Sequence, residues 1–258
     1  MSTFEVQNLF SVKGKVVLVT GGSRGIGKMI STGFVRNGAK VYVTSRTAKD
    51  CEETAKELTA LGPGICISLP ANLQKYEEVE RLANELSSRE SAVHILVNNA
   101  GALWNSPIDD FPDAAFAKVF TLNLQRIFTV TQKLLPLLRA GAAAGKNGKI
   151  FEDPARIINI GSIEGLSLPH NETYAYTASK AALHHLMTAH ALKTVGVPLL
   201  ASTPAQRFGK AEDAAGTALF LASPAASWIN GATIILDGGL LLSRDELKQA
   251  ALTSMSKL

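Results

Sequence analysis

The sequence is poor in the residues that mark several large protein classes. Only two cysteines occur among 258 residues, Cys51 and Cys66, so we expect no disulfide framework and favour a reducing compartment. No apolar run approaches the roughly 18–20 residues that span a bilayer, so no membrane association is expected. Residues 1–15 lack the apolar core of a signal peptide. Cys66 lies in an apolar run, where a thiol usually acts as a small core side chain.

Charge and aromatic residues are also sparse. The net charge is +4, aromatics make up 6%, and no basic run alternates with aromatic residues, so nothing favours nucleic-acid binding. The five histidines show no ligand-like spacing with carboxylates or cysteines, so no metal site is expected. The adjacent His184 and His185 are expected to serve packing or a subunit interface. A hydrophobic share of 46% with 19% charged residues is typical of a globular chain, here interpreted as one domain over residues 1–258.

Apolar, β-branched runs alternate with segments of helical period. Strands are predicted at residues 16–19, 40–44, 65–68, 94–97 and 156–159. Helices are predicted at residues 26–37, 50–61, 76–88 and 113–139, and residues 140–153 are interpreted as a surface loop. This alternation predicts an α/β fold, a Rossmann-type doubly wound parallel sheet with helices on both faces.

A glycine-rich turn follows the first predicted strand. Residues 20–27 read Thr-Gly-Gly-Ser-Arg-Gly-Ile-Gly, and a helix is predicted directly afterwards. The glycines Gly21, Gly25 and Gly27 allow a sharp turn, close approach to a pyrophosphate and tight packing of the helix on the strand. The N-terminus of that helix offers free N–H groups to the anion. The turn therefore predicts a dinucleotide site.

The end of the second predicted strand indicates which dinucleotide binds. An NAD site there usually carries a carboxylate that bonds the ribose 2′-hydroxyl, but this strand ends Thr44-Ser-Arg46. Arg46 is suited to a 2′-phosphate through charge-assisted hydrogen bonds, and Arg24 in the glycine turn offers a second clamp. We therefore expect NADP(H) as the cofactor.

Tyr176 and Lys180 stand one helical turn apart, on one helix face. A free tyrosine has a pKa of about 10, and an adjacent ammonium together with a cationic nicotinamide ring would lower it. Ser162 ends the fifth predicted strand, at the sheet edge where open α/β sheets bind ligands. Its hydroxyl is placed to hold a substrate carbonyl beside the tyrosine.

With these motifs the chain resembles the classical short-chain dehydrogenase/reductase family, particularly its 3-oxoacyl reductase-like members. The residues that carry the resemblance are the turn at 20–27, the run Asn98-Asn-Ala-Gly101, Ser162, Tyr176 with Lys180, and Asn123. A further match runs from Arg207 to Gly239 and implies a C-terminal helix and a last strand.

The resemblance implies hydride delivery from NADPH to a ketone, with Ser162, Tyr176, Lys180 and Asn123 as the catalytic set. Asn123 matches the helix asparagine that holds a relay water in that family, and Asn72 stands where the family usually has an aspartate facing the adenine. The implied cofactor-binding residues are Gly21, Ser23, Arg24, Gly25, Ile26, Gly27, Arg46, Asn72, Leu73, Asn99, Ala100, Gly101, Tyr176 and Lys180.

One region departs from the family pattern. Family members follow the tyrosine helix with a sixth strand, a Pro-Gly turn and a helical substrate lid, but residues 191–206 have no Pro-Gly turn. Pro198 interrupts the only apolar stretch there and disfavours a central strand. We therefore expect the sixth strand and most of the lid to be shortened or missing. Either the chain is a shortened form with little activity, or residues 197–202 substitute as a rough strand.

The sequence ends in Ser256-Lys-Leu258, the tripeptide read by the peroxisomal import receptor. A short targeting tail is therefore expected over residues 243–258, with peroxisomal localisation or, as the alternative, a cytoplasmic one. Peroxisomes handle acyl-CoA thioesters, so the leading expectation is reduction of a 3-oxoacyl or secondary-metabolite ketone. The alternatives are a 2,4-dienoyl-CoA reductase or an impaired paralogue that only binds cofactor. The family is usually tetrameric, so a homo-tetramer or dimer is expected.

Overall fold

The computed structural model describes residues 5–147, 150–151, 153–167, 171–186, 204–205, 207 and 209–241. Its centre is a sheet of five parallel strands in the order β3-β2-β1-β4-β7. The strands are β1 (Val16–Thr20), β2 (Lys40–Thr44), β3 (Ile65–Ser68), β4 (Ile95–Asn98) and β7 (Arg156–Asn159). The order reverses between β1 and β4, which is where ligands bind in doubly wound sheets. The predicted Rossmann-type α/β fold is confirmed.

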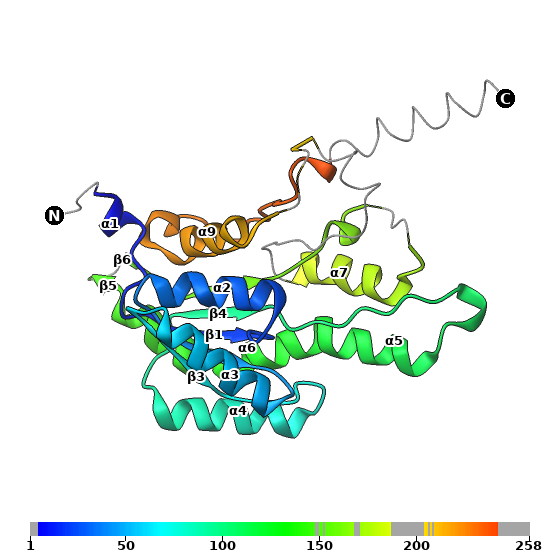
Figure 1. Cartoon of the computed structure of the whole chain (residues 1–258), viewed down its shortest axis with the longest axis horizontal. Helices are drawn as coiled ribbons and strands as arrows, with labels where there is room; N and C mark the ends of the chain where they lie inside the picture. Colours follow the sequence, from blue (N-terminus) through cyan, green and yellow to red (C-terminus); the bar gives the residue numbers. More distant parts are fainter. Residues whose placement is uncertain are drawn as a thin grey trace.

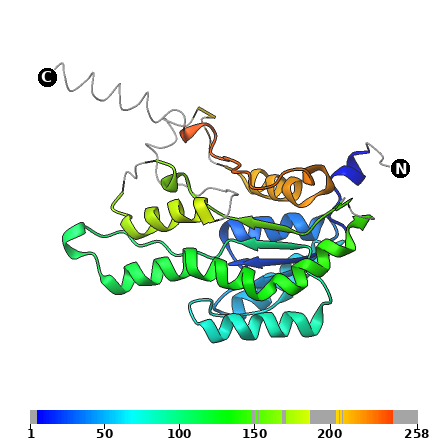
Figure 2. The same ribbon diagram turned by 180° about the vertical axis from the view of Figure 1, so that it is seen from behind.

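The helices cover both faces of this sheet, as Figures 1 and 2 show from opposite sides. They are α1 (Val6–Leu9), α2 (Gly25–Arg36), α3 (Ala48–Ala60), α4 (Tyr76–Arg89), α5 (Asp113–Phe120), α6 (Arg126–Ala144), α7 (Tyr174–Leu186) and α9 (Ala211–Ala222). Short turns of 3-10 helix are η1 (Ile108–Asp110), η3 (Ile163–Gly165) and η4 (Pro224–Ala226). Because both faces are covered, the central strands are apolar throughout: all five residues of β1 are buried.

Each face has its own hydrophobic core. On one side α2, with Ile30 and Phe34 buried, packs on the sheet beneath α9. The two helices approach closely because Gly33 has no side chain, and a Cβ there would lie 2.8 Å from the Cβ of Ala215. On the other side α4 and α6 enclose Leu82 and Leu134. Cys51 and Cys66 are buried free thiols, and burial raises the pKa of Cys66 to about 12, so this thiol stays protonated.

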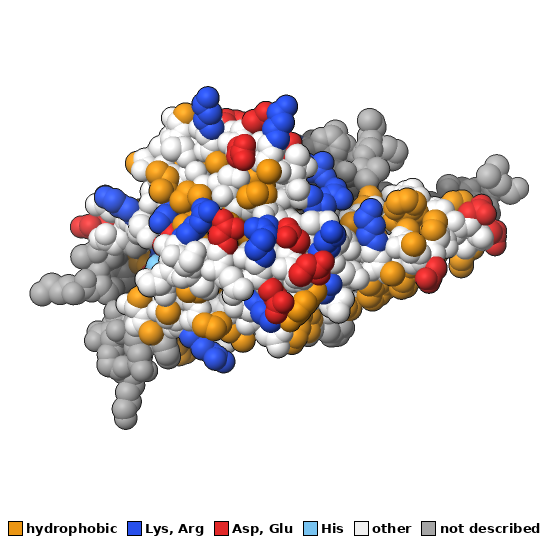
Figure 3. All heavy atoms as spheres, turned by 90° about the horizontal axis from the view of Figure 1, so that it is seen from below, with side chains coloured by type: hydrophobic (Ala, Val, Ile, Leu, Met, Phe, Trp, Pro, Cys, Tyr) orange, Lys and Arg blue, Asp and Glu red, His pale blue; other side chains and the backbone are white. Residues whose placement is uncertain are grey.

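The surface on the side of α4 carries charges of both signs. Figure 3 shows Lys and Arg intermixed there with Asp and Glu, and the arrangement follows from ion pairs along the helices. Arg81 pairs with Glu78 and Glu85 at 2.9 Å, and Lys133 pairs with Glu80 at 2.7 Å. Such exposed pairs contribute little stability, about 0–1 kcal/mol each, but they leave no large field of one sign. No helix within the described part of the chain is long and apolar enough to cross a membrane.

Two predicted boundaries around the long helical stretch were wrong. The single helix expected at residues 113–139 is α5 and α6 with a π turn, η2 (Thr121–Gln125), between them. The loop expected at 140–153 begins later, because the alanine-rich end of α6 continues the helix to Ala144. After Gly145 the chain forms a short antiparallel hairpin, β5 (Lys146–Asn147) and β6 (Ile150–Phe151).

The expected last strand before Gly239 is likewise absent from the described residues, where 232–236 adopt no strand conformation. A strand needs a hydrogen-bonding neighbour, and the described part of the sheet ends at β7. The region predicted to lack the sixth strand and lid, 191–206, lies almost wholly outside the described residues. The predicted tail at 243–258 lies entirely outside them.

The amino ends of the strands hold a partly buried charged cluster that predicts a pH effect on stability. His94 Nδ1 accepts a hydrogen bond from the Val16 N–H at 3.0 Å, which requires the neutral ring. Burial, and then the nearby charge of Lys15, lowers the pKa of His94 below its ordinary value. Lys15 itself pairs with Asp153 at 2.8 Å.

The unfolded chain takes up a proton on this histidine near pH 6.5, before the folded protein does. We therefore expect the contribution of His94 to the free energy of unfolding to be complete above about pH 6.5 and to be lost as the pH falls below that value. Urea unfolding at pH 7.5, 6.5 and 5.5 measures this loss. In His94→Asn, whose amide oxygen can accept the Val16 N–H without titrating, the loss should be smaller; an equal loss in both proteins would contradict the assignment.

Candidate active site

A cavity of about 610 Å³ opens at the carboxyl ends of the strands. Its walls come from the turns after β1, β2, β3, β4 and β7 and from α5, the π turn and α7. The sequence-predicted residues that line it are Gly21, Ser23, Arg24, Ile26, Arg46, Asn72, Leu73, Asn99, Ala100, Gly101, Ser162, Tyr176 and Lys180. Gly25, Gly27 and Asn123 are not in contact with this space. The fold thus brings segments between residues 21 and 180 together around one cavity.

The glycine turn has the conformation that its sequence predicts. Gly21 and Gly25 adopt φ angles of +64° and +53°, which favour glycine because a Cβ would be strained there. Gly27 is required for a different reason. A Cβ on Gly27 would lie 2.3 Å from the Gly21 carbonyl oxygen and 2.5 Å from Asn99 Nδ2. The helix can therefore begin directly against the turn.

We expect Gly27→Ala to be among the most damaging small substitutions in the chain. The added methyl group must displace backbone of the turn, so both the melting temperature and dinucleotide affinity should fall, the latter by about tenfold or more. Gly216→Ala on exposed α9 is the matched control, because a Cβ there meets nothing within 4 Å. Thermal unfolding and NADPH fluorescence titration of both variants measure the effect. Unchanged binding by Gly27→Ala would contradict the assigned role of the turn.

Thr20 and Asn99 fix the turn to the neighbouring strand. Thr20 Oγ1 accepts hydrogen bonds from the N–H groups of Asn99 and Ala100, both at 2.9 Å. Asn99 Nδ2 in turn donates to the carbonyl oxygens of Thr20 at 2.9 Å and Gly21 at 3.1 Å. Asn99 thus supports the glycine turn as well as lining the cavity. Thr20 was not among the predicted site residues, although it stands next to the first glycine.

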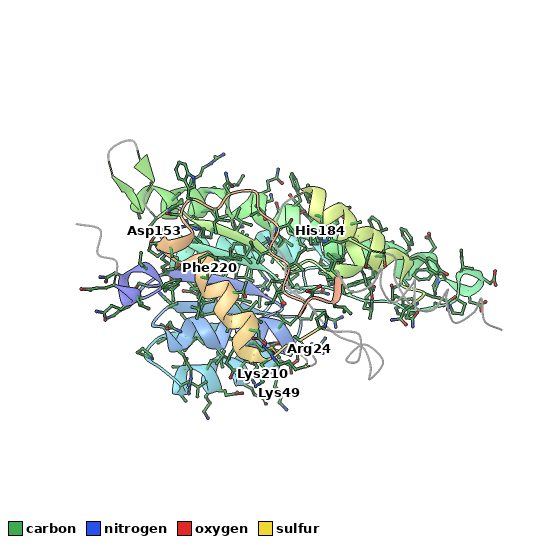
Figure 4. All side chains as sticks on the ribbon, turned by 90° about the horizontal axis from the view of Figure 1, so that it is seen from above. Arg24, Lys49, Asp153, His184, Lys210 and Phe220 are labelled. Atoms are coloured by element: carbon green, nitrogen blue, oxygen red, sulfur yellow. The ribbon has the colours of Figure 1, made fainter. Side chains whose placement is uncertain are left out.

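The end of β2 has two features suited to an anionic ligand. Arg24 and Arg46 are exposed at the cavity and, within the part of the chain that the structure describes, pair with no carboxylate. Figure 4 shows Arg24 well apart from Asp153. Thr44 also lines this space, and its fully buried Oγ1 has no hydrogen-bond partner in the described structure. Two guanidinium groups without a carboxylate partner in the described structure fit a bound anionic group.

Asn72 follows β3 at the same rim. Its Oδ1 accepts a hydrogen bond from the Gln74 N–H at 3.2 Å, which holds the side chain in a local turn. The second lone pair of that oxygen leaves room for an outside donor.

Ser162, Tyr176 and Lys180 meet at the other end of the cavity. The Ser162 hydroxyl lies close enough to the Tyr176 phenol to lower its pKa. Lys180 Nζ lies 5.8 Å from the centre of the Tyr176 ring and donates to the Ile160 carbonyl oxygen at 2.6 Å. Gly165 allows η3 to pack closely against α7, because a Cβ on this residue would lie 2.6 Å from the Lys180 carbonyl carbon.

The pKa of Tyr176 is raised on balance, and Lys180, which the sequence argument expected to lower it, is not among the causes. Burial raises the pKa of the phenol, the Ser162 hydroxyl lowers it, and the charge of Glu164 raises it again. Burial also lowers the pKa of Lys180 to about 8. The Lys180 ammonium lies 5.8 Å from the centre of the Tyr176 ring and donates to the Ile160 carbonyl oxygen rather than to the phenol.

Asn123 is fully buried in the π turn and holds two backbone segments together. Its Oδ1 accepts from the Ala102 N–H at 2.8 Å, and its Nδ2 donates to the Ala102 carbonyl at 2.9 Å and to Ser179 Oγ at 3.1 Å. Ser179 Oγ in turn donates to the Tyr176 carbonyl oxygen at 2.7 Å. The Asn123 side chain is therefore committed to these groups. These hydrogen bonds do not test the relay water that was predicted at Asn123.

Other residues at the site were not singled out from the sequence. The cavity walls include Ser45, Gln74, Leu103, Trp104, Lys118 and Glu164. His184 lies on α7, as Figure 4 shows, and its Nε2 is 3.0 Å from the Ser162 carbonyl oxygen. This contact is of the packing kind expected for His184. The sequence could have pointed to Ser179 and Glu164, because each stands within two residues of a catalytic candidate. Their contacts depend on tertiary packing.

Comparison with known proteins decides the family. A family model described as "short chain dehydrogenase" matches residues 15–199, and one described as "Enoyl-(Acyl carrier protein) reductase" matches residues 195–241. The chain belongs to the short-chain dehydrogenase family. It is therefore an oxidoreductase by family, which confirms the resemblance identified from the motifs.

Two relatives and one solved structure illustrate the similarity. A "Rhamnolipids biosynthesis 3-oxoacyl-[acyl-carrier-protein] reductase" of Pseudomonas aeruginosa is 38% identical, over 90% of this chain and 98% of its own. A 7alpha-hydroxysteroid dehydrogenase of Escherichia coli K12 is 32% identical, over 92% and 97%. The structure of the "Pseudomonas aeruginosa RhlG/NADP active-site complex" superposes with a TM-score of 0.82 at 37% identity, over 90% and 98% of the two chains.

The alignment with the 3-oxoacyl reductase contains positions that this chain does not fill. It has 261 positions, yet 90% of this 258-residue chain is about 232 residues, so about 29 positions of the relative have no residue here. The expected loss of a strand and most of a helical lid around residues 191–206 stays a prediction.

Proposed function

We propose that this short-chain dehydrogenase is an NADPH-dependent reductase that converts a ketone to a secondary alcohol. The observation that carries the proposal is the single cavity in which the glycine turn and two unpaired arginines face the Ser162, Tyr176 and Lys180 cluster. The NADP complex of a structure that is 37% identical supports the choice of cofactor.

The residues at the cavity fit NADP(H). Arg24 and Arg46 would hold the 2′-phosphate, the turn after β1 the pyrophosphate, and Lys180 the nicotinamide ribose. When bound, the cofactor supplies the hydride.

The chain's own residues position the ketone and supply the proton. The Ser162 hydroxyl would hold the carbonyl oxygen beside the Tyr176 phenol, whose pKa it lowers. The phenol O–H would donate its proton to that oxygen as negative charge develops there. The Lys180 ammonium would stabilise the phenolate that remains. Asn123 and Ser179 would hold the backbone of Tyr176 in place.

The finer proposal is a 3-oxoacyl thioester or related carbonyl as substrate, which the 3-oxoacyl reductase relative supports. NADPH oxidation at 340 nm against 3-oxoacyl thioesters, unactivated ketones and a 2,4-dienoyl thioester tests it. Turnover of 3-oxo compounds is expected, and turnover of the dienoyl compound alone would move the assignment to a dienoyl reductase.

A second candidate is a chain that binds cofactor without turnover. The departure of residues 191–206 from the family pattern favours it, because a chain without the sixth strand and the lid would lack a wall of the nicotinamide pocket. Tight NADPH binding with no oxidation of any compound in the same panel would establish this candidate.

Peroxisomal targeting through Ser256–Leu258 remains a prediction, as the tripeptide lies outside the described residues. A fluorescent protein fused to the amino end of the chain should give punctate fluorescence that coincides with a peroxisomal marker. Deleting the last three residues should make it diffuse. Diffuse fluorescence of the intact fusion would favour the cytoplasmic alternative.

A further inference from the structure

Glu164 brings a carboxylate into the part of the cavity that holds the catalytic candidates. It lies in η3, the 3-10 turn that begins directly after Ser162, and its N–H donates to Ser162 Oγ at 3.2 Å. The residue lines the same cavity as Tyr176. The backbone of Glu164 is therefore tied to the serine proposed to hold the substrate carbonyl.

The carboxylate has a fixed orientation. Thr173 Oγ1 donates to Glu164 Oε2 at 2.9 Å, and Thr173 is only 2% exposed. Thr177 Oγ1, one turn into α7, lies 3.2 Å from the same Thr173 hydroxyl. A buried hydroxyl held by a helix thus positions the charge, which keeps it from turning freely into solvent.

The charge of Glu164 reaches the reacting end of the site. Burial is the largest cause of the raised pKa of the Tyr176 phenol, and the negative charge of Glu164 also raises it. A negative charge felt by a buried phenol is also felt by any group of a substrate bound against that phenol.

No described residue neutralises this carboxylate with an ion pair. The cations that line the cavity, apart from Lys180, are Arg24 after β1, Arg46 after β2 and Lys118 on α5. Lys180 Nζ is held by the Ile160 carbonyl. The cavity is thus positive where a dinucleotide phosphate would lie, and beside Ser162 it holds the Lys180 ammonium and the Glu164 carboxylate, which is the only acidic side chain among its described lining residues.

The remaining wall of this end is apolar. Leu103 and Trp104 line the cavity and are 55% and 40% exposed, which leaves apolar surface available for a ligand. An uncharged ketone with a hydrocarbon chain matches such a lining. A carboxylate next to the ketone would be desolvated on binding and repelled by the negative charge of Glu164.

We propose that Glu164 determines substrate specificity by excluding ketones that carry a carboxylate beside the carbonyl and admitting uncharged 3-oxo esters, thioesters and amides. This inference rests on the proposed ketone reductase function. Like-charge exclusion is a common means of discriminating between otherwise similar ligands.

The test uses acetoacetamide and acetoacetate, which have nearly the same shape and differ in charge. Their kcat/KM values are measured by NADPH oxidation with the full-length protein. The wild-type protein should prefer the amide by about tenfold or more, because the Glu164 carboxylate disfavours a second negative charge bound against Tyr176. Glu164→Gln keeps the length and the acceptor for Thr173 but removes the charge, and should narrow the preference to about threefold or less.

Glu172→Gln is the matched control: Glu172 is an exposed acid nearby in the chain that does not line the cavity, so the wild-type preference should remain. Equal use of both compounds by the wild-type protein, or a preference that persists in Glu164→Gln, would overturn the inference while leaving the reductase function intact.

If neither compound nor any other ketone is reduced, the proposed function fails and binding decides the role of Glu164. Calorimetric titration of the NADP⁺-saturated protein should then show that Glu164→Gln strengthens binding of acetoacetate relative to acetoacetamide. No change in that ratio would overturn the inference.

Discussion

Tyr176→Phe should reduce the turnover of any accepted ketone by about 10²–10⁴-fold, the usual contribution of a positioned general acid. The substitution removes one hydroxyl at the cavity and keeps the ring that packs beside Lys180. NADPH affinity should remain within about threefold of wild type, because the glycine turn and the arginines are untouched. Steady-state kinetics and fluorescence titration of the same preparation separate the two effects.

Tyr174→Phe provides the control on the same helix. Tyr174 is 38% exposed, stacks edge-on against Phe111 with ring centres 5.8 Å apart, and does not line the cavity. It should keep wild-type turnover. A Tyr176→Phe protein that turns over ketones at the wild-type rate would exclude the assigned proton donor and with it the proposed mechanism.

Arg46→Asp should reverse the cofactor preference. The wild-type guanidinium is exposed at the end of β2, where the ribose 2′-phosphate of NADPH is expected. Loss of one or two charge-assisted hydrogen bonds, each worth about 1.5–3 kcal/mol, weakens NADPH binding by about 10²-fold. The new carboxylate repels the phosphate and can accept a hydrogen bond from the 2′-hydroxyl of NADH.

Titration of both dinucleotides by fluorescence measures this change. Arg139→Asp makes the same charge change on the exposed surface of α6, outside the cavity walls, and should leave the preference for NADPH as it is. Equal affinities of the wild-type protein for NADPH and NADH would contradict the role given to Arg46.

The alternation of apolar strands and amphipathic helices was sufficient to predict the central fold. The strands are buried on both faces and so read as continuous apolar runs, as β1 does. Errors occurred where local sequence is ambiguous. The alanine-rich end of α6 has high helix propensity, and the composition that suggested a loop did not outweigh it. The π turn at Thr121–Gln125 has no compositional signal that separates it from the α-helices on either side.

The sequence by itself determined the chemistry that is available: glycines where the backbone turns sharply, one arginine in that turn and another in place of a carboxylate after the second strand, and a phenol and an ammonium one helical turn apart. These are local properties, set by residue type and by spacing within one element. Only the tertiary structure decided which groups act on each other. It showed that Asn123 is committed to Ala102 and Ser179, that burial raises the pKa of Tyr176, and that the Glu164 carboxylate lies in the cavity. Burial and electrostatic interaction depend on distances between segments far apart in the chain, and no local pattern contains those distances.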